Sequence, residues 1–274
     1  AFWAPHQYRH MDPVTPTAEQ VARAAQMLIA AEAPMIHAGS GIIHAGAYDE
    51  LRRVSEILHA PVTTSWAARG VLPETCETSI PMPYMKLNHE VRNDSDLVRV
   101  AGSRLGETDW WGKAPYWRRP SEQQMIQVDV DGHVLGSNKP AALTALADAK
   151  LFLGALADAL VARTGRMNLD ARRRKVAKYR DTARAERAKL DEKLADMAVP
   201  MNTGHVAHTC QQVFPEGSVL IADGGNTAVW AMMFHQMRVP NTILSTFKFG
   251  MLGAGAAQAL GAAVARPATP VCCI

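Results

Sequence analysis

Residues 33–64 read APMIHAGSGIIHAGAYDELRRVSEILHAPVTT, and this stretch decides the fold class. An apolar run over residues 34–38 ends at a glycine and predicts a strand. Leu51, Val54 and Leu58 then recur at the spacing of one helix face, before a second apolar run over residues 60–64. A strand, a helix and a strand joined by short connections predict a parallel β-sheet.

The same alternation extends in both directions from this stretch. Upstream, Thr17 opens a capping box, and a helix with apolar residues at helical spacing follows it. Downstream, strands are expected over residues 97–101 and 125–130, and a helix over residues 147–163. Because strands that alternate with helices form sheets covered on both faces, we predict a Rossmann-like α/β domain over residues 17–165.

A second α/β unit follows a polar segment. Residues 166–200 are rich in charged helix formers and predict a helical connector. After a further helix, the strand over residues 219–222 and the small-residue helix around Leu260 predict an α/β domain over residues 201–274. The first 16 residues hold three prolines and predict an extended linker.

The composition is that of a globular protein. The chain has 274 residues, of which 48% are hydrophobic and 20% charged. Its net charge of +3 is too small to indicate nucleic-acid binding, and the basic residues crowded between 172 and 193 predict a solvated helix face. No apolar run reaches the length of a membrane span, no signal-peptide pattern opens the chain, and the four cysteines form no C-x-x-C pair. We expect reduced thiols, a cytoplasmic protein and no membrane partner.

Three glycine-rich turns follow predicted strands, at the sheet edge where α/β proteins bind ligands. Gly39-Ser40-Gly41 begins like a dinucleotide fingerprint, but a histidine stands where its third glycine belongs. Residues 223–227 read DGGNT and would form an anion-binding nest of backbone amides. Residues 249–255 read FGMLGAG and precede a helix of small residues, where close packing is an equal explanation. Each turn, taken singly, is compatible with a structural or a functional role.

Other constellations are weaker. His205 and His208 share a helix face, but no third ligand is near them in the sequence, so a solvated surface is favoured over a metal site. Trp110, Trp111 and Trp117 are interpreted as loop or interface packing rather than as a surface for stacking bases. The sequence contains no hydrolase, metalloprotease or phosphate-loop motif.

The order of these pieces resembles the thiamine diphosphate enzymes that include acetolactate synthase, benzoylformate decarboxylase and oxalyl-CoA decarboxylase. Residues 33–42, APMIHAGSGI, are similar to the opening of that family's middle domain, and residues 69–73, RGVLP, to a loop after its second strand. Residues 95–104, SDLVRVAGSR, and residues 126–131, IQVDVD, continue in family order. The resemblance implies a middle domain followed by the first part of a thiamine diphosphate-binding domain.

Five candidate cofactor-binding residues are implied by this resemblance. Gly225, Asn226 and Thr227 fall where the loop amides of the family meet the cofactor's diphosphate. Leu252 falls where the family places a bulky apolar residue under the bent cofactor. Gly250 falls where a backbone carbonyl accepts a hydrogen bond from the aminopyrimidine.

Departures from the family limit what the resemblance implies. Acetolactate synthases usually carry Gln-His in place of Asn226-Thr227 and Pro-Ala in place of Ala257-Gln258, so their substrate does not carry over. The family's magnesium motif, Gly-Asp-Gly followed by Asn, would begin just past Ile274, and its activating glutamate would lie before Ala1. We therefore expect a fragment cut at both ends, in which neither magnesium ligands nor catalytic residues can be assigned.

The implied activity is decarboxylation or carboligation of a 2-oxo acid or related acyl substrate, by a homodimer or homotetramer that uses thiamine diphosphate and magnesium. Two alternatives stay open. In the first, the middle domain binds FAD or ADP at the ends of three strands, through Gly39, Ser40, Gly41, Gly102, Ser103, Arg104 and Asp129. In the second, the chain is a purely structural module that is catalytically inactive by itself.

Overall fold

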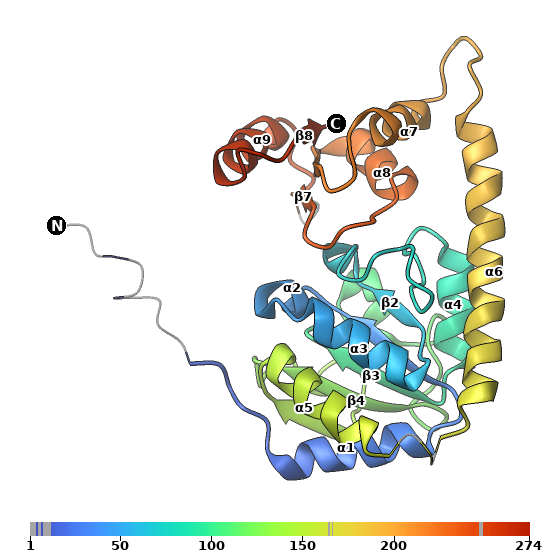
Figure 1. The fold of residues 1–274 in the computed structure, drawn as a ribbon, viewed down its shortest axis with the longest axis vertical. Helices are drawn as coiled ribbons and strands as arrows, with labels where there is room; N and C mark the ends of the chain where they lie inside the picture. The colour runs from blue at the N-terminus through green and yellow to red at the C-terminus, as the bar shows by residue number, and fades with distance from the viewer. Residues whose placement is uncertain (1–3, 5–6, 8–11, 164, 166, 247–248) are drawn as a thin grey trace.

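The computed structural model describes residues 4, 7, 12–163, 165, 167–246 and 249–274. These residues form two parallel sheets, one of five strands and one of three. We call the first sheet with its helices the five-strand unit, and the second sheet with its helices the three-strand unit. Figure 1 shows the three-strand unit above the five-strand unit, with one long helix running along the side of both.

All strands of the first sheet run parallel, in the order β2-β1-β3-β4-β5. The strands are β1 (Pro34–Ala38), β2 (Val62–Thr64), β3 (Leu97–Ala101), β4 (Gln124–Asp129) and β5 (Leu143–Leu146). In β1, Ile36 pairs with Val62 of β2 on one side and with Arg99 of β3 on the other. The parallel α/β fold class predicted from the sequence is therefore confirmed.

Helices cover both faces of this sheet, because successive side chains of a strand point to opposite sides. They are α1 (Ala18–Ala30), α2 (Gly41–Ala45), α3 (Tyr48–Leu58), α4 (Met85–Asp94) and α5 (Ala149–Val161), with two short 3-10 helices, η2 (Trp66–Ala68) and η3 (Glu107–Gly112). The predicted capping box opens α1. The Thr17 hydroxyl accepts a hydrogen bond from the Gln20 amide, and the Gln20 side chain accepts one from the Thr17 amide.

Two apolar clusters fill the space between this sheet and its helices. The larger cluster joins Ile36 and Ile126 to α1, α3 and α5. The smaller cluster joins Met35 and Val98 to α4 and to the long helix α6 (Leu169–Leu194). Residues 35 and 36 thus belong to different clusters, as the alternation of a strand requires. Trp117 lies in the loop between η3 and β4, and its side chain is fully buried in the smaller cluster.

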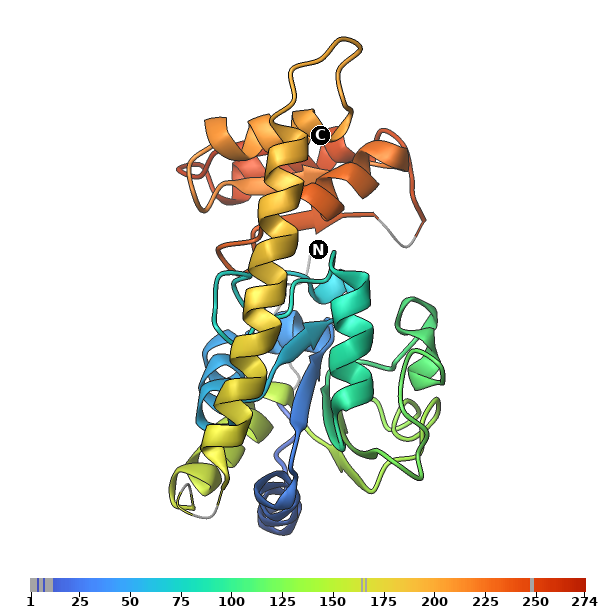
Figure 2. The same ribbon diagram turned by 90° about the vertical axis from the view of Figure 1, so that its right-hand side faces the viewer.

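Helix α6 extends from the bottom of the five-strand unit to the three-strand unit (Figure 2). The sequence predicts a solvated face for its basic residues, and much of the helix is exposed. Arg172 departs from this expectation. It is only 3% exposed and donates hydrogen bonds to the carbonyl oxygens of Leu28, Ile29 and Ala31 at the C-terminal end of α1. A cation at that end also compensates the negative pole of the helix dipole.

In the three-strand unit, β6 (Val219–Ala222) lies between β7 (Ile243–Ser245) and β8 (Val271–Cys273), and both neighbours run parallel to it. The helices of this unit are α7 (Gly204–Val213), α8 (Gly225–Phe234) and α9 (Ala254–Ala265). Its apolar clusters are small, and the larger of them joins Leu220, Ala231 and Met237. Many large apolar side chains of this unit are exposed instead.

Some expectations concern the chain as a whole. The predicted linker over residues 1–16 lies largely outside the described residues. All four cysteines carry free thiols. Across the described ranges, no helix combines the length and the apolar character that crossing a bilayer requires.

Candidate functional site

Asp223 lies immediately after the carboxyl end of β6 and connects this strand to α9. Its carboxylate accepts hydrogen bonds from the backbone amides of Gly253 (2.9 Å) and Gly255 (2.8 Å), where α9 begins. The amides of Gly255 and Gly253 hold the pKa of Asp223 below its usual range. The carboxylate is therefore ionised at neutral pH and fixes the loop that precedes α9.

That loop passes directly over the glycine pair that follows Asp223. A Cβ atom on Gly224 would lie 2.6 Å from the carbonyl carbon of Met251 and 2.7 Å from the carbonyl oxygen of Gly250. A Cβ atom on Gly225 would lie 3.1 Å from Cδ2 of Leu252, and Gly225 has a φ of +69°. The close approach and the left-handed backbone both favour glycine here. The structure thus brings together the second and third glycine-rich turns of the sequence.

The N-terminus of α8 opens beside this contact. Its N-cap residue, Gly224, supplies no side-chain cap, and amides of the first helical turn have no intrahelical acceptor. Gly225, Asn226 and Thr227, which form this turn, are exposed. Uncapped amides at a helix N-terminus carry partial positive charge and bind anions such as phosphate. Three of the five cofactor candidates therefore form one potential anion site.

The other two candidates lie in the loop above this turn. Leu252 is 74% exposed, although its methyl group lies next to Gly225. Gly250 is also exposed and has a φ of +59°. An exposed leucine in a loop that Asp223 holds in place is available to a ligand and is not explained by core packing. The arrangement combines an anion site with an adjacent apolar side chain.

The sequence places Asp223 in the turn of residues 223–227 but gives no sign that its carboxylate holds the loop before α9. Its hydrogen-bond partners come 30 and 32 residues later in the chain. An aspartate that caps a helix commonly stands directly before it in the sequence, whereas Asp223 caps a distant helix. The only local signal is a carboxylate placed between a buried strand and two glycines.

The described residues contain no cluster of three or more His, Cys, Asp and Glu side chains that could hold a metal ion. Nδ1 of His205 lies 2.8 Å from the carbonyl oxygen of Leu194, and Nε2 of His208 lies 2.9 Å from Nε2 of Gln212. Both histidines thus have protein partners. These contacts favour a structural role for the pair.

The first glycine-rich turn, at the end of β1, packs against the turn that follows β3. A Cβ atom on Gly39 would lie 2.1 Å from the carbonyl oxygen of Gly102, and one on Gly41 would lie 2.5 Å from Cα of Gly102. Ser40 is the N-cap of α2, which has only five residues. Contact between the two turns accounts for all three glycines without a ligand.

The remaining nucleotide candidates lie at different depths. Ser103 is buried, with its hydroxyl 3.5 Å from the Asp109 carboxylate, whereas Arg104 is exposed. Asp129, at the end of β4, accepts a hydrogen bond from the amide of Asp131 (3.1 Å), and burial raises its pKa. Both Ser103 and Asp129 therefore have local partners within the five-strand unit.

A buried polar cluster surrounds Asp109 of η3. Nε2 of His37 lies 3.4 Å from Oδ1 of Asp109, and Nη2 of Arg92 lies 3.9 Å from the same atom. The guanidinium of Arg92 stacks on the ring of Trp117 at 4.7 Å. Burial alone would raise the pKa of Asp109, but His37 and Arg92 outweigh it and hold this pKa below its usual range. Because all four side chains are buried, the cluster is part of the core and does not face a substrate.

Two family models match the chain. The model of the thiamine pyrophosphate enzyme central domain matches residues 21–156, most of the five-strand unit. The model of the C-terminal thiamine pyrophosphate-binding domain matches residues 223–274. The second match begins at Asp223 and includes all five cofactor candidates.

Relatives with curated descriptions point the same way. The acetolactate synthase large subunit of Corynebacterium glutamicum is 27% identical over 92% of this chain and 40% of that protein. The chloroplastic acetolactate synthase 2 of Nicotiana tabacum is 28% identical over 91% of this chain and 36% of that protein. The probable 2-ketoarginine decarboxylase of Pseudomonas aeruginosa is 28% identical over 98% of this chain and 45% of that protein. The chain thus spans less than half the length of these relatives.

The fold also matches a solved structure. An X-ray structure from Mycobacterium smegmatis, assigned as a thiamin diphosphate-dependent enzyme, has a TM-score of 0.68 and 21% sequence identity, over 97% of this chain and 49% of that one. At this identity the match shows the fold alone. None of these matches supports FAD or ADP in the five-strand unit, so that alternative stays a prediction. Since the two family models match both units in the expected order, the chain belongs to the thiamine pyrophosphate enzyme family.

Proposed function

We propose that this chain supplies the cofactor-binding face of a thiamine diphosphate-dependent enzyme that decarboxylates or ligates 2-oxo acids or related acyl substrates. One observation carries the proposal: Asp223 holds the exposed Leu252 beside the uncapped N-terminus of α8. This pairs donors for a diphosphate with an apolar surface for an aromatic ring. Similarity to acetolactate synthases and to a probable 2-ketoarginine decarboxylase supports the substrate class.

Each candidate has a distinct role in this proposal. The amides of Gly225, Asn226 and Thr227 would donate to the diphosphate, because they lie at the positive end of α8. Leu252 would contact the cofactor rings, and the carbonyl of Gly250 would accept a hydrogen bond from the pyrimidine amino group. Bound thiamine diphosphate supplies an electron sink for breaking or forming a carbon–carbon bond beside a carbonyl.

Magnesium belongs to the proposal, but the described residues offer little to hold it. A hard cation needs several oxygen ligands. The carboxylate of Asp223, at the end of β6, is already engaged by the amides of Gly253 and Gly255. We therefore expect this chain to bind thiamine diphosphate weakly and with little dependence on magnesium. Tight, magnesium-dependent binding in a calorimetric titration would show that the site is misplaced.

We also propose that the protein is a cytoplasmic homodimer or homotetramer. Leu260 and Val264 are one turn apart on α9 and are 71% and 82% exposed. Large apolar side chains exposed on one helix face are typical of interaction surfaces. The four free thiols are in keeping with a reducing compartment. Analytical ultracentrifugation tests the oligomer, and a monomer at all accessible concentrations would contradict it.

The proposed cofactor site is tested by NMR titrations of the isotope-labelled chain with pyrophosphate, thiamine diphosphate and ADP. Pyrophosphate should shift the amide signals of residues 225–227. Thiamine diphosphate should in addition shift the methyl signals of Leu252 and the signals of Gly250. Shifts confined to residues 39–41 and 102–104 on addition of ADP would favour the nucleotide alternative.

Two exposed leucines give a matched pair of variants. Leu252→Ala should weaken thiamine diphosphate binding about fivefold, since it removes roughly 1 kcal/mol of apolar contact, and should leave pyrophosphate binding unchanged. Leu260→Ala, which removes an equally exposed leucine from the same unit, should change neither affinity. An unchanged affinity of Leu252→Ala for thiamine diphosphate would place the cofactor rings elsewhere.

A further inference from the structure

The two units touch where the loop after β2 meets the segment after α8. The Glu74 amide donates to the carbonyl oxygen of Met237 (2.8 Å), and the Met237 amide donates to Oε2 of Glu74 (2.9 Å). Gly70 has a φ of +83°, and a Cβ atom on it would lie 3.1 Å from Cβ of Met237. Nη2 of Arg69 donates to the carbonyl oxygen of His235. One short loop of the five-strand unit thus holds His235 and Met237 of the three-strand unit.

Arg69 and Glu74 form an ion pair inside this contact. Nε and Nη2 of Arg69 lie 2.7 Å and 2.9 Å from the two carboxylate oxygens of Glu74. The side chains are only 2% and 5% exposed. A bidentate pair has a defined geometry, and removing one partner leaves the other charge buried without compensation. The pair therefore gives the contact between the units one preferred geometry.

The segment held in this way is the C-terminal end of α8. His235 is the C-cap residue, and its amide still donates to the carbonyl oxygen of Ala231. Nη1 of Arg187, on α6, donates to the carbonyl oxygen of Phe234 (3.1 Å). Arg69 and Arg187 thus satisfy the last two carbonyls of the helix end. Cations at this end also stabilise a helix through its dipole.

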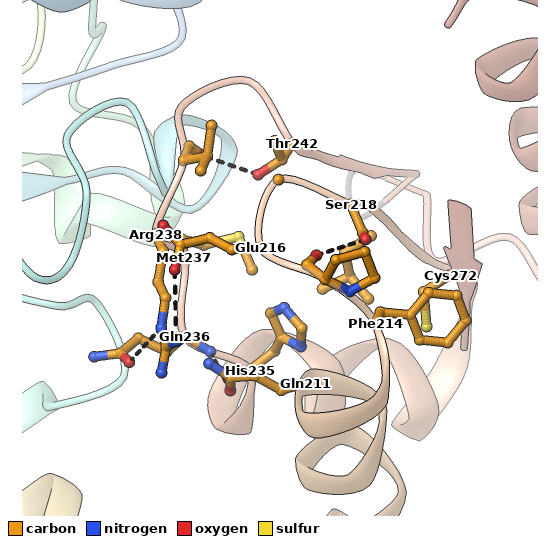
Figure 3. A pocket seen from close by; sticks show the side chains of 14 residues that line it. Gln211, Phe214, Glu216, Ser218, His235, Gln236, Met237, Arg238, Thr242 and Cys272 are labelled. Carbon is orange, nitrogen blue, oxygen red and sulfur yellow. Dashed lines mark hydrogen bonds and ion pairs between the residues drawn. The ribbon is translucent and has the colours of Figure 1, made fainter. Parts of the chain in front are cut away.

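A pocket lies on another side of the same segment (Figure 3). The ring of His235 points into it, towards the turn that follows Phe214 at the end of α7. Arg238 and Glu216 also line the pocket, and both side chains are largely exposed. They form an ion pair in which Nη1 of Arg238 lies 3.6 Å from Oε2 of Glu216. The pocket leaves free volume on this side of residues 235–237. The buried contact with Arg69 and Glu74 restrains the same segment from the other side.

Helix α8 has ten residues and is therefore a rod about 15 Å long. A tilt at its C-terminal end displaces the amides of its first turn. We propose that Arg69 and Glu74 are positioning residues, which act with Arg187 through the last turn of α8 to set the place of the Gly225–Thr227 amides. As far as the ligand of those amides is concerned, the inference rests on the proposed function.

Hydrogen exchange on the whole chain, measured by mass spectrometry, tests the positioning without a ligand. In Glu74→Gln, the hydrogen-bonded amides of α8 and of residues 235–237 should exchange at least about tenfold faster, while those of β6 and α9 stay unchanged. Glu216→Gln is the control, because it breaks an exposed ion pair on the same segment. Equal acceleration throughout the three-strand unit, or none in α8, would overturn the proposal.

Pyrophosphate affinity gives a second readout, measured by NMR well below the unfolding temperature. Glu74→Gln should raise the dissociation constant several-fold. Arg69→Lys, which keeps the charge but loses the bidentate geometry, should raise it less. Arg187→Gln should also weaken binding, whereas Arg184→Gln, an exposed neighbour on α6, should not.

The two readouts separate the possible failures. If the unmodified chain binds no pyrophosphate, the proposed function fails, and the exchange of α8 still decides whether Arg69 and Glu74 position this helix. If Glu74→Gln loosens α8 but leaves the pyrophosphate affinity unchanged, the two residues anchor the helix without positioning its first turn. That result would overturn the inference while leaving the proposed function intact.

Discussion

The five-strand unit encloses its large apolar side chains, whereas the three-strand unit leaves many of them in contact with water. Ile36, Leu51 and Phe152 are fully buried in the larger cluster of the five-strand unit. In the three-strand unit, Leu252 and Leu260 are mostly exposed. The first unit thus owes its order to its own core, while the second keeps apolar surface available for a ligand or another chain. The proposed cofactor site lies entirely in the less enclosed unit.

The largest expected effect compares a core residue with an exposed one. Phe152→Ala should lower the free energy of unfolding of the five-strand unit by roughly 3–5 kcal/mol, because it opens a cavity in the larger cluster. Leu252→Ala should change the free energy of unfolding by less than about 0.5 kcal/mol, because that side chain already contacts water. Urea denaturation followed by circular dichroism measures both. A comparable loss in the two variants would remove the contrast between the units.

A smaller effect is expected for a buried arginine in the core of the five-strand unit. Arg99 in β3 is fully buried, and its three guanidinium nitrogens have no hydrogen-bond partner among the described residues. Burial lowers the pKa of Arg99 to about 9. Arg99→Met should raise the free energy of unfolding by about 1–3 kcal/mol, because it removes a buried charge that has no hydrogen-bond partner and keeps an apolar side chain. The ring of Phe152, 5.3 Å from the guanidinium, offsets only part of the cost of burying this charge. Scanning calorimetry measures the change.

Arg172→Met is the matched control for this variant. Arg172 is also buried, but it donates to the carbonyl oxygens at the end of α1. Its replacement should lower the free energy of unfolding by roughly 2–3 kcal/mol, because those carbonyls lose charged donors. If Arg99→Met destabilises the protein as Arg172→Met does, the buried charge of Arg99 does not cost stability. The core of the five-strand unit would then tolerate that charge.

The smallest expected effect is a pH dependence in the three-strand unit. Burial, and then the charge of Arg69, lower the pKa of His235 to about 4, against about 6.5 in an unfolded chain. Between these values the unfolded chain binds more protons than the folded chain. The contribution of His235 to stability is therefore complete above pH 6.5 and is lost as the pH falls towards 4. The full difference in pKa corresponds to about 3 kcal/mol, and solvent around the half-buried ring reduces the expected loss to roughly 1–2 kcal/mol.

Denaturation of the three-strand unit at several pH values measures this loss. His235→Gln removes the titrating ring, so the stability of this variant should depend less on pH between 6.5 and 4. Glu74, Arg69 and Arg187 also face His235, and they remain in the variant. An unchanged pH dependence would mean that another group is responsible and that His235 is not protected from protonation.

Elements with long apolar periodicity could be predicted from the sequence, whereas short or polar ones could not. The amphipathic helix α1 and the buried strand β3 follow directly from their patterns. The four-residue edge strand β5 is too short to show a period. The helix α4 is rich in polar and charged residues, and it forms because Leu87 and Val91 pack on the sheet. Tertiary packing overrides weak local preference in both cases.

The residue at which α8 begins could not be predicted from its sequence. Gly225, Asn226 and Thr227 are turn formers, so the sequence predicts a turn that ends before Ala228. In the structure the helix begins at Gly225 itself. The expected anion-binding amides are therefore those of a helix N-terminus, where the helix dipole adds to their effect.

By itself the sequence determined the parallel α/β fold class, the order of the elements and the resemblance to thiamine diphosphate enzymes, because these depend on local patterns and on short motifs. Only the tertiary structure decided that Asp223 holds the loop of Leu252 over Gly225, and that Arg69 and Glu74 meet the far end of α8. These contacts join residues about 30 and more than 160 positions apart. No local pattern encodes such pairs, since it is the packing of the two sheets and of α6 that brings them within hydrogen-bond distance.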